Sequence, residues 1–126
     1  AVEAVALRAV WRLVGTLGFT PRLDACARDA QPLASRGPVT FSVADGGLLC
    51  PDCARAAGAE AKRIQAEDCR DLAALTAEDG EIQDLDARHA AAHRRLLGRW
   101  IRHHVGGNRA FPALDWWEQR PWAAAS

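Results

Sequence analysis

Residues 17–53 read LGFTPRLDACARDAQPLASRGPVTFSVADGGLLCPDC, and this stretch is the most informative part of the sequence because it interrupts an otherwise helical chain. Helical periodicity is lost over 24–53, where prolines and glycines accumulate. The segments 39–43 and 48–49 flank an Asp-Gly-Gly turn at 45–47. This pattern predicts a small β-hairpin inside a loop-rich insert.

Four cysteines, Cys26, Cys50, Cys53 and Cys69, lie in this insert or shortly after it. Cys50 and Cys53 form a CxxC pair, whose spacing lets both thiolates face one tetrahedral metal ion. Cys26 and Asp29 repeat this spacing, with a carboxylate in place of the second thiol. Because carboxylates also bind zinc, at about 2.0–2.2 Å, these two pairs predict one structural zinc ion.

Other interpretations of the cysteines stay open at this point. The hairpin can be held by packing alone, with the thiols buried as small hydrophobic groups. Cys69 can replace Asp29 as the fourth ligand if its helix folds back over the insert. A disulfide framework is disfavoured because nothing indicates secretion. A thioredoxin-like redox role is disfavoured because no βαβ pattern surrounds Cys50 and Cys53.

The rest of the chain has the periodicity of helices. Helices are predicted over 3–17, 51–64, 68–75, 85–105 and 112–119, although Gly58 weakens the second of these. A composition without Tyr or Met, and with only three Phe, also favours helix packing. The 126 residues suit one domain. The fold class is mainly α: a helical domain with an inserted zinc-finger-like loop, residues 24–53, and a small β-hairpin.

The charges are unevenly distributed, although the formal net charge is zero. Residues 1–81 carry nine basic and twelve acidic side chains, whereas residues 82–126 carry seven and four. Arginines recur along one side of the predicted helix 85–105, and the set is Arg88, Arg94, Arg95, Arg99 and Arg102. This face can neutralise phosphates of DNA or hold the carboxylates of an acidic peptide tail. It can also be a solvated basic face without a ligand.

The ends and the hydropathy of the chain carry two further expectations. The chain does not begin with Met and its helical pattern starts at once, so we expect a segment of a longer protein. No run of 18 apolar residues and no basic-then-apolar leader is present in these residues. We therefore expect a cytoplasmic protein without a membrane partner.

Three runs carry a resemblance to a known family: LGFTPRLDAC at 17–26, Phe41-Ser42, and GGLLCPDC at 46–53. In order and spacing they resemble the zinc-finger segment of the bacterial RecO family. The stretch 96–117 is similar to the closing helices of that family, but it is generic. The sequence departs from the family pattern at Asp29, where zinc-binding members have a second cysteine.

The resemblance implies a function that composition and spacing do not. RecO proteins are recombination mediators that bind single- and double-stranded DNA, anneal complementary strands and help to load the recombinase. They work with a RecR-type ring protein and with the C-terminal tail of the single-stranded-DNA-binding protein. The family's N-terminal OB-fold domain is not in these residues. The resemblance also implies a bacterial, nucleoid-associated location.

Two hypotheses from different classes follow, and neither is an enzyme. The first is a DNA-repair scaffold in which the insert fixes a docking surface and the arginine-bearing helix contacts DNA or an acidic tail. The second is a zinc-ribbon protein-interaction module without DNA contact of its own. A metal-dependent hydrolase is disfavoured, because three thiolates and Asp29 would fill all four positions of a zinc ion.

Overall fold

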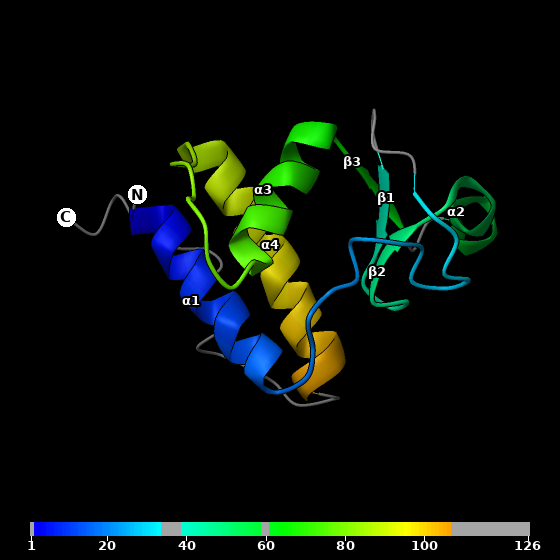
Figure 1. Cartoon of the computed structure of the whole chain (residues 1–126), viewed down its shortest axis with the longest axis horizontal. Helices are drawn as coiled ribbons and strands as arrows, with labels where there is room; N and C mark the ends of the chain where they lie inside the picture. Colours follow the sequence, from blue (N-terminus) through cyan, green and yellow to red (C-terminus); the bar gives the residue numbers. More distant parts are fainter. Residues whose placement is uncertain (1, 34–38, 59–60, 107–126) are drawn as a thin grey trace. The chain divides into compact units, whose positions relative to one another are not determined.

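The computed structural model describes residues 2–33, 39–58 and 61–106 (Figure 1). The chain forms two compact units. The helical unit consists of Ala1–Phe19 and Ala74–Ser126, and the finger unit consists of Thr20–Ala73. In chain order the elements are α1 (Val2–Thr16), β1 (Val39–Ser42), β2 (Gly47–Leu49), α2 (Pro51–Ala57), β3 (Lys62–Ile64), α3 (Ala66–Thr76), α4 (Ala87–Ile101) and a π-helical turn (Arg102–Gly106).

The helical unit is built on the packing of α1 against α4. Trp11 of α1 and Trp100 of α4 are both buried, and their ring centroids lie 5.9 Å apart. The indole N–H of Trp100 donates to the backbone carbonyl of Phe19 at 2.8 Å, so burial leaves this polar group satisfied. Other buried apolar side chains of the unit are Leu7, Val14, Leu75, Leu96 and Leu97. The expected helices over 3–17 and 85–105 are confirmed.

A buried ion pair joins the start of α1 to the middle of α4. Arg94 is 2% exposed and donates from Nη1 to Oε2 of Glu3 at 2.6 Å. The prediction that Arg94 lies on the basic face with its neighbours is therefore wrong. Sequence periodicity could not show this, because Glu3, the partner that makes its burial tolerable, lies 91 residues away in the sequence.

Arginines of α1 also hold the segment that follows the end of α3. Arg8 donates from Nη1 to the carbonyl of Gly80 and from Nη2 to the carbonyl of Ala74, each at 2.7 Å. Arg12 donates to the carbonyl of Glu78. Helix ends leave backbone carbonyls without partners, and the Arg8 guanidinium satisfies one of them, that of Ala74 in the last turn of α3.

The finger unit contains a three-stranded antiparallel sheet with β1 in the centre, and Figure 1 shows α2 beside it. Ser42 pairs with Gly47 and Phe41 with Leu48, so the expected hairpin is confirmed. The Gly47 backbone lies against that of Arg22, and a Cβ on Gly47 would be 2.1 Å from the Arg22 carbonyl oxygen. Only glycine fits here, because the segment before the hairpin pairs closely with it.

The helix expected over 51–64 is wrong in its second half. α2 ends at Ala57, and Gly58 adopts a left-handed φ of 64° at its C-terminus. The chain then forms β3, whose Ile64 pairs with Val39 of β1. Tertiary pairing thus overrides the apolar spacing that favoured a continuous helix. The helix expected over 112–119 lies outside the described residues.

None of the helices in the described part of the chain is long and apolar enough to cross a membrane.

Candidate metal centre and basic helix face

The first pair of candidate ligands lies on a tight loop. The backbone N–H of Cys26 donates to the carbonyl of Gln31, and that of Ala30 donates to the carbonyl of Cys26, both at 2.9 Å. Ala30 has a φ of 65°, which is unusual for a residue with a side chain. The Gln31 N–H donates to Asp29 Oδ1 at 3.0 Å. This leaves the second oxygen of Asp29, Oδ2, for other partners.

The second pair lies where β2 leads into α2. Cys50 occupies the N-cap position, Pro51 the first turn, and Cys53 the same turn. Proline suits this place because its fixed φ matches the helix and its missing N–H needs no partner there. The Ala54 N–H donates to the Cys50 carbonyl at 2.8 Å, which closes the turn. Local sequence therefore brings both thiols to the start of one helix.

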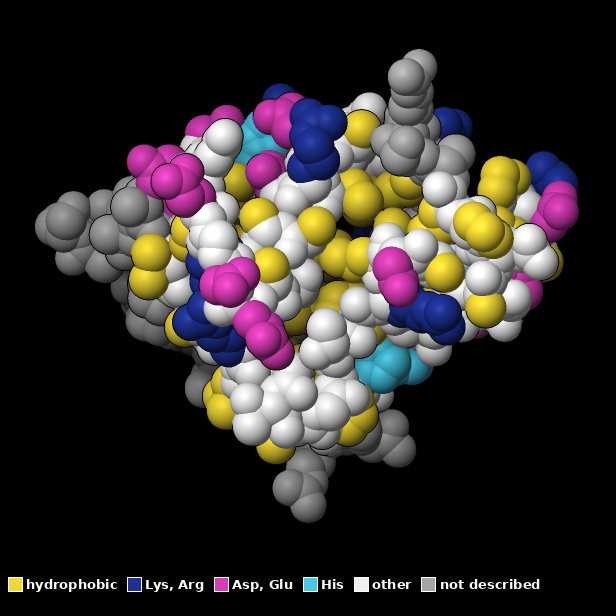
Figure 2. Space-filling view, in the orientation of Figure 1, with side chains coloured by type: hydrophobic (Ala, Val, Ile, Leu, Met, Phe, Trp, Pro, Cys, Tyr) yellow, Lys and Arg dark blue, Asp and Glu magenta, His cyan; other side chains and the backbone are white. Residues whose placement is uncertain are grey.

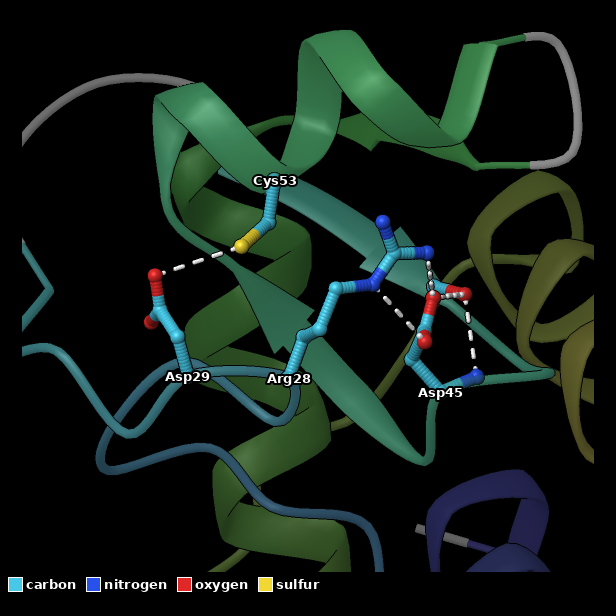
Figure 3. A network of polar contacts seen from close by, with 5 residues as sticks. Arg28, Asp29, Asp45 and Cys53 are labelled. Atoms are coloured by element: carbon cyan, nitrogen blue, oxygen red, sulfur yellow. Dashed lines mark hydrogen bonds and ion pairs between the residues drawn. The ribbon is translucent and has the colours of Figure 1, made fainter.

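The two pairs converge. Ligand atoms of Cys26, Asp29, Cys50 and Cys53 all lie within 4.8 Å of one another. Asp29 Oδ2 accepts from the thiols of Cys50 at 3.4 Å and Cys53 at 3.3 Å; Figure 3 shows the second contact. Tetrahedral zinc with the usual bond lengths sets sulfur and oxygen about 3.6 Å apart. The donor set and its spacing therefore fit a zinc ion.

The contacts within the cluster also set its acid–base properties. The Gln31 N–H and, after it, the thiols of Cys26 and Cys53 lower the pKa of Asp29 to about 2. Burial, followed by the contact with Asp29, raises the pKa of Cys53 to about 12. The Asp29 carboxylate is thus the acceptor for the S–H groups of Cys50 and Cys53. A divalent cation would displace these thiol protons and take their place between sulfur and oxygen.

The Cys26 sulfur is additionally held by backbone groups. Burial works to raise the pKa of the Cys26 thiol, but N–H donors, the strongest from the Cys50 backbone, outweigh it and the pKa is lowered. N–H donors aimed at a sulfur stabilise its thiolate, which is the form that binds metals. The three thiols are buried and Asp29 is exposed. Cys69 does not belong to this cluster, and burial raises its pKa.

The basic face of α4 carries four of the five predicted arginines. Arg88, Arg95 and Arg99 are exposed, and Arg102 is partly exposed at the start of the π-helical turn. Ala90, Leu97 and Trp100 on the opposite side are buried. Arg94 belongs to the buried side and pairs with Glu3. We call Arg88, Arg95, Arg99 and Arg102 the basic face.

A polar network beside the cluster was missed by the sequence analysis. Arg28, between the first two ligands, forms a two-point pair with Asp45 in the hairpin turn (Figure 3). Asp45 also accepts from the hydroxyl of Ser42 at 2.8 Å. The pair spans 17 residues of sequence. Only the position of Arg28 between two candidate ligands could have drawn attention to it.

The chain is similar to known proteins of one family. The family model described as "Recombination protein O C terminal" matches residues 1–110. The DNA repair protein RecO of Anaeromyxobacter sp. strain Fw109-5 is 35% identical over 84% of this chain and 40% of its own length. The protein of the same name from strain K is 37% identical over 84% of the chain and 39% of its own length.

A third relative covers less of the chain. The DNA repair protein RecO of Moorella thermoacetica is 45% identical over 42 residues, which are 33% of this chain and 16% of that protein. No solved structure matches the chain. The chain spans about 40% of the length of the first relatives it matches. The matched model covers most of the chain, which therefore belongs to the RecO family and corresponds to its C-terminal part.

Proposed function

We propose that this chain is a non-catalytic part of a bacterial recombinational DNA-repair protein. In this role it binds DNA and repair partners and supports strand annealing and recombinase loading. Its partners are single- and double-stranded DNA, a RecR-type ring protein and the C-terminal tail of the single-stranded-DNA-binding protein, in the cytoplasm at the nucleoid. The family match over residues 1–110, with relatives named as DNA repair proteins, is the observation that carries the proposal.

The basic face supplies the contact with polyanions. Arg88, Arg95 and Arg99 are exposed on a helix whose other side is anchored by buried Leu97 and Trp100. A guanidinium group can bind two oxygens of a phosphate or carboxylate at once. A helix fixed by its core presents such groups at constant spacing. The same face therefore suits a DNA backbone and the carboxylates of an acidic tail.

We also propose one structural zinc ion held by Cys26, Asp29, Cys50 and Cys53. With four protein ligands the ion would have no open position for a substrate, so it would join the first loop to the start of α2. The spacing of the ligand atoms and the N–H donors to Cys26 support this assignment. A finger unit stabilised in this way would be a firm surface for a protein partner.

A titration of DNA against salt concentration tests the basic face. For the wild-type chain, the logarithm of DNA affinity should fall linearly with the logarithm of salt concentration. Replacing Arg95 and Arg99 by Glu should weaken binding to DNA and to the tail peptide. A matched control, Arg55→Glu with Arg63→Glu, makes the same charge change at exposed residues of the finger unit. Equal affinities for the two double variants would refute the proposed face.

A second candidate function is a protein-interaction module without DNA contact. It is favoured by the zero net charge and by the surface in Figure 2, where acidic and basic side chains alternate on the face shown. Such a mixed surface gives weak long-range attraction for DNA. The salt series separates the candidates, because this one predicts no DNA affinity for wild-type protein at low salt.

Metal content tests the zinc assignment. Purified chain should contain one equivalent of zinc, and a chelator should remove it. Hydrogen exchange should then increase in the finger unit while α1 and α4 keep their protection. Absence of bound zinc after reconstitution under reducing conditions would refute the assignment.

A further inference from the structure

Arg28 and Asp45 form an ion pair with two contact points beside the candidate metal centre. Arg28 Nε lies 3.1 Å from Asp45 Oδ1, and Nη2 lies 2.9 Å from Oδ2. Figure 3 shows the guanidinium group reaching across to the turn that carries Asp45. Two parallel contacts fix the direction of both side chains, whereas one contact fixes only a distance.

Asp45 is itself held in place. Its Oδ2 accepts from the Ser42 hydroxyl at 2.8 Å, and its backbone N–H donates to the same hydroxyl oxygen at 3.1 Å. Ser42 is 1% exposed and lies at the end of β1. The carboxylate that receives Arg28 is therefore anchored to the sheet by a buried group.

The pair connects the two halves of the candidate centre. Arg28 follows Cys26 by two residues and directly precedes Asp29, whereas Asp45 lies in the turn that leads through β2 to Cys50. The backbone N–H of Ala27 donates a hydrogen bond to the carbonyl of Leu48 at 2.7 Å, which attaches the start of the loop to β2. The Arg28 pair is a further attachment of this loop, on the side of Asp29.

We propose that Arg28 is a positioning residue for the metal centre: its pair with Asp45 holds the loop that carries Cys26 and Asp29 at the distance that zinc requires from Cys50 and Cys53. This inference rests on the proposed zinc site. The side chains are 39% and 21% exposed, and partly exposed ion pairs contribute little to overall stability. The effect of the pair is therefore expected in metal affinity.

Positioning and simple electrostatics predict opposite outcomes for Arg28. Removing a cation beside the centre makes the local potential more negative, so electrostatics alone predicts tighter zinc binding for Arg28→Met. It predicts weaker binding for Asp45→Asn, because a negative charge is lost. Positioning predicts weaker binding for both, and a double variant no weaker than either single one.

The experiment measures zinc affinity of the whole chain by competition with a chromophoric chelator, together with the absorption spectrum of the cobalt-substituted protein. Arg28→Met and Asp45→Asn should each lower zinc affinity about tenfold, a typical effect of removing a group that orients metal ligands. The double variant should show a similar loss. Arg28→Lys keeps the charge but not the two-point contact, so it should also bind less tightly.

Arg22→Met is the matched control. Arg22 pairs with exposed Asp24 at 3.4 Å, and its substitution changes the charge by the same amount on the segment that precedes the first ligand pair. Its zinc affinity should match that of the wild type. The cobalt spectrum of the Arg28 and Asp45 variants should shift, because displaced ligands alter the coordination geometry. A purely structural role would leave that spectrum unchanged in the folded protein.

The outcomes separate this inference from the zinc assignment. If wild-type protein binds no zinc, the assignment fails and the positioning role falls with it. If wild-type protein binds zinc but Arg28→Met binds it equally or more tightly, only the positioning role is overturned. Weaker binding by Arg28→Met, Arg28→Lys and Asp45→Asn without additivity supports it.

Discussion

The core of the helical unit and the cluster around the candidate metal centre in the finger unit are built from different side chains. Buried side chains of the helical unit include Leu7, Trp11, Leu97 and Trp100, each of which contributes roughly 1.5–3 kcal/mol or more on burial. The cluster around the candidate metal centre consists instead of Cys26, Leu49, Cys50 and Cys53, so three of its four members are thiols.

This difference shows which interactions have to stabilise the thiol cluster. Large apolar side chains bring their own stabilisation, whereas the partly buried neighbours of the thiol cluster are Leu33 and three alanines, Ala54, Ala57 and Ala61. Small side chains bury little area, so backbone hydrogen bonds, polar pairs and a metal ion must supply more of the stability of this cluster. We therefore expect ligand substitutions to act on the finger unit and to leave the helical unit intact, although the finger unit also buries the large apolar side chains of Phe41, Leu48 and Leu72.

The largest effect is expected for Arg94→Ala in the helical unit. Loss of Arg94 leaves the Glu3 carboxylate buried without its cation, which should cost about 3–5 kcal/mol in the free energy of unfolding. Urea unfolding measures this change. Arg95→Ala, at the exposed neighbouring position, should stay within about 0.5 kcal/mol of wild type.

A double variant sharpens this prediction. Arg94→Met with Glu3→Gln removes both charges and should recover much of the lost stability, because the cost comes from an unpaired charge. Equal stabilities of Arg94→Ala and Arg95→Ala would show that the ion pair is unimportant, and the contrast between the units would then rest on apolar packing alone.

The next effect concerns Asp29 and the finger unit. Asp29→Ala removes a ligand and should weaken zinc binding by more than the roughly 10- to 100-fold caused by loss of an outer hydrogen-bond partner. Asp29→Asn keeps an oxygen for the Gln31 N–H but loses the charge, so it should bind zinc with intermediate affinity. Asp29→Cys should bind it more tightly. Chelator competition measures all three, and unchanged affinity in Asp29→Ala would contradict the assignment.

Gly47→Ala should destabilise the finger unit by about 1–3 kcal/mol, because the new Cβ would collide with the Arg22 backbone. Exchange of the Leu48 amide, which donates to the Arg22 carbonyl at 2.9 Å, reports this locally. Gly46→Ala is the matched control: Gly46 also has a positive φ, of 92°, but a Cβ there meets nothing within 4 Å. If both variants cost the same, close approach of the two backbones is not the reason for glycine at 47.

The smallest effect is expected at the start of α4. The Asp86 carboxylate accepts from the His89 backbone N–H at 2.8 Å, so Asp86→Ala should lower the melting temperature by a few degrees. Asn also caps helices, and Asp86→Asn should lose less. This loss should be confined to the helical unit, with zinc affinity unchanged.

The effect should depend on pH in a defined direction. The backbone N–H of His89, followed by its side chain, holds the pKa of Asp86 below its ordinary value of 3.8. The stabilisation is therefore complete above about pH 3.8 and is lost as the pH falls through the lower pKa of the folded state. Wild type and Asp86→Ala should converge in stability under acid conditions. A constant difference down to the lowest pH would show that the cap acts without its charge.

Local patterns in the sequence were enough for the hairpin, for helices α1 and α4, and for the set of candidate ligands. The Asp-Gly-Gly turn and the two-residue gap within each ligand pair are local features of the sequence. The structure confirms the hairpin and brings both ligand pairs together. Contacts between residues far apart in the sequence could not be predicted from these local patterns. Ile64 was expected in a helix because nothing nearby indicates that it pairs with Val39. The pair of Arg28 with Asp45 has no signature in spacing.

Local sequence patterns were therefore sufficient to predict which residues could bind a metal, where α1 and α4 lie, and which side of α4 is rich in arginine. Long-range contacts determine which arginine leaves that side, which strand completes the sheet, and that Arg28 pairs with Asp45. The physical reason is the range of the interactions. Periodicity and turn chemistry act over a few residues, whereas the Glu3–Arg94 pair joins side chains 91 residues apart, and its contribution appears only when folding removes both from water.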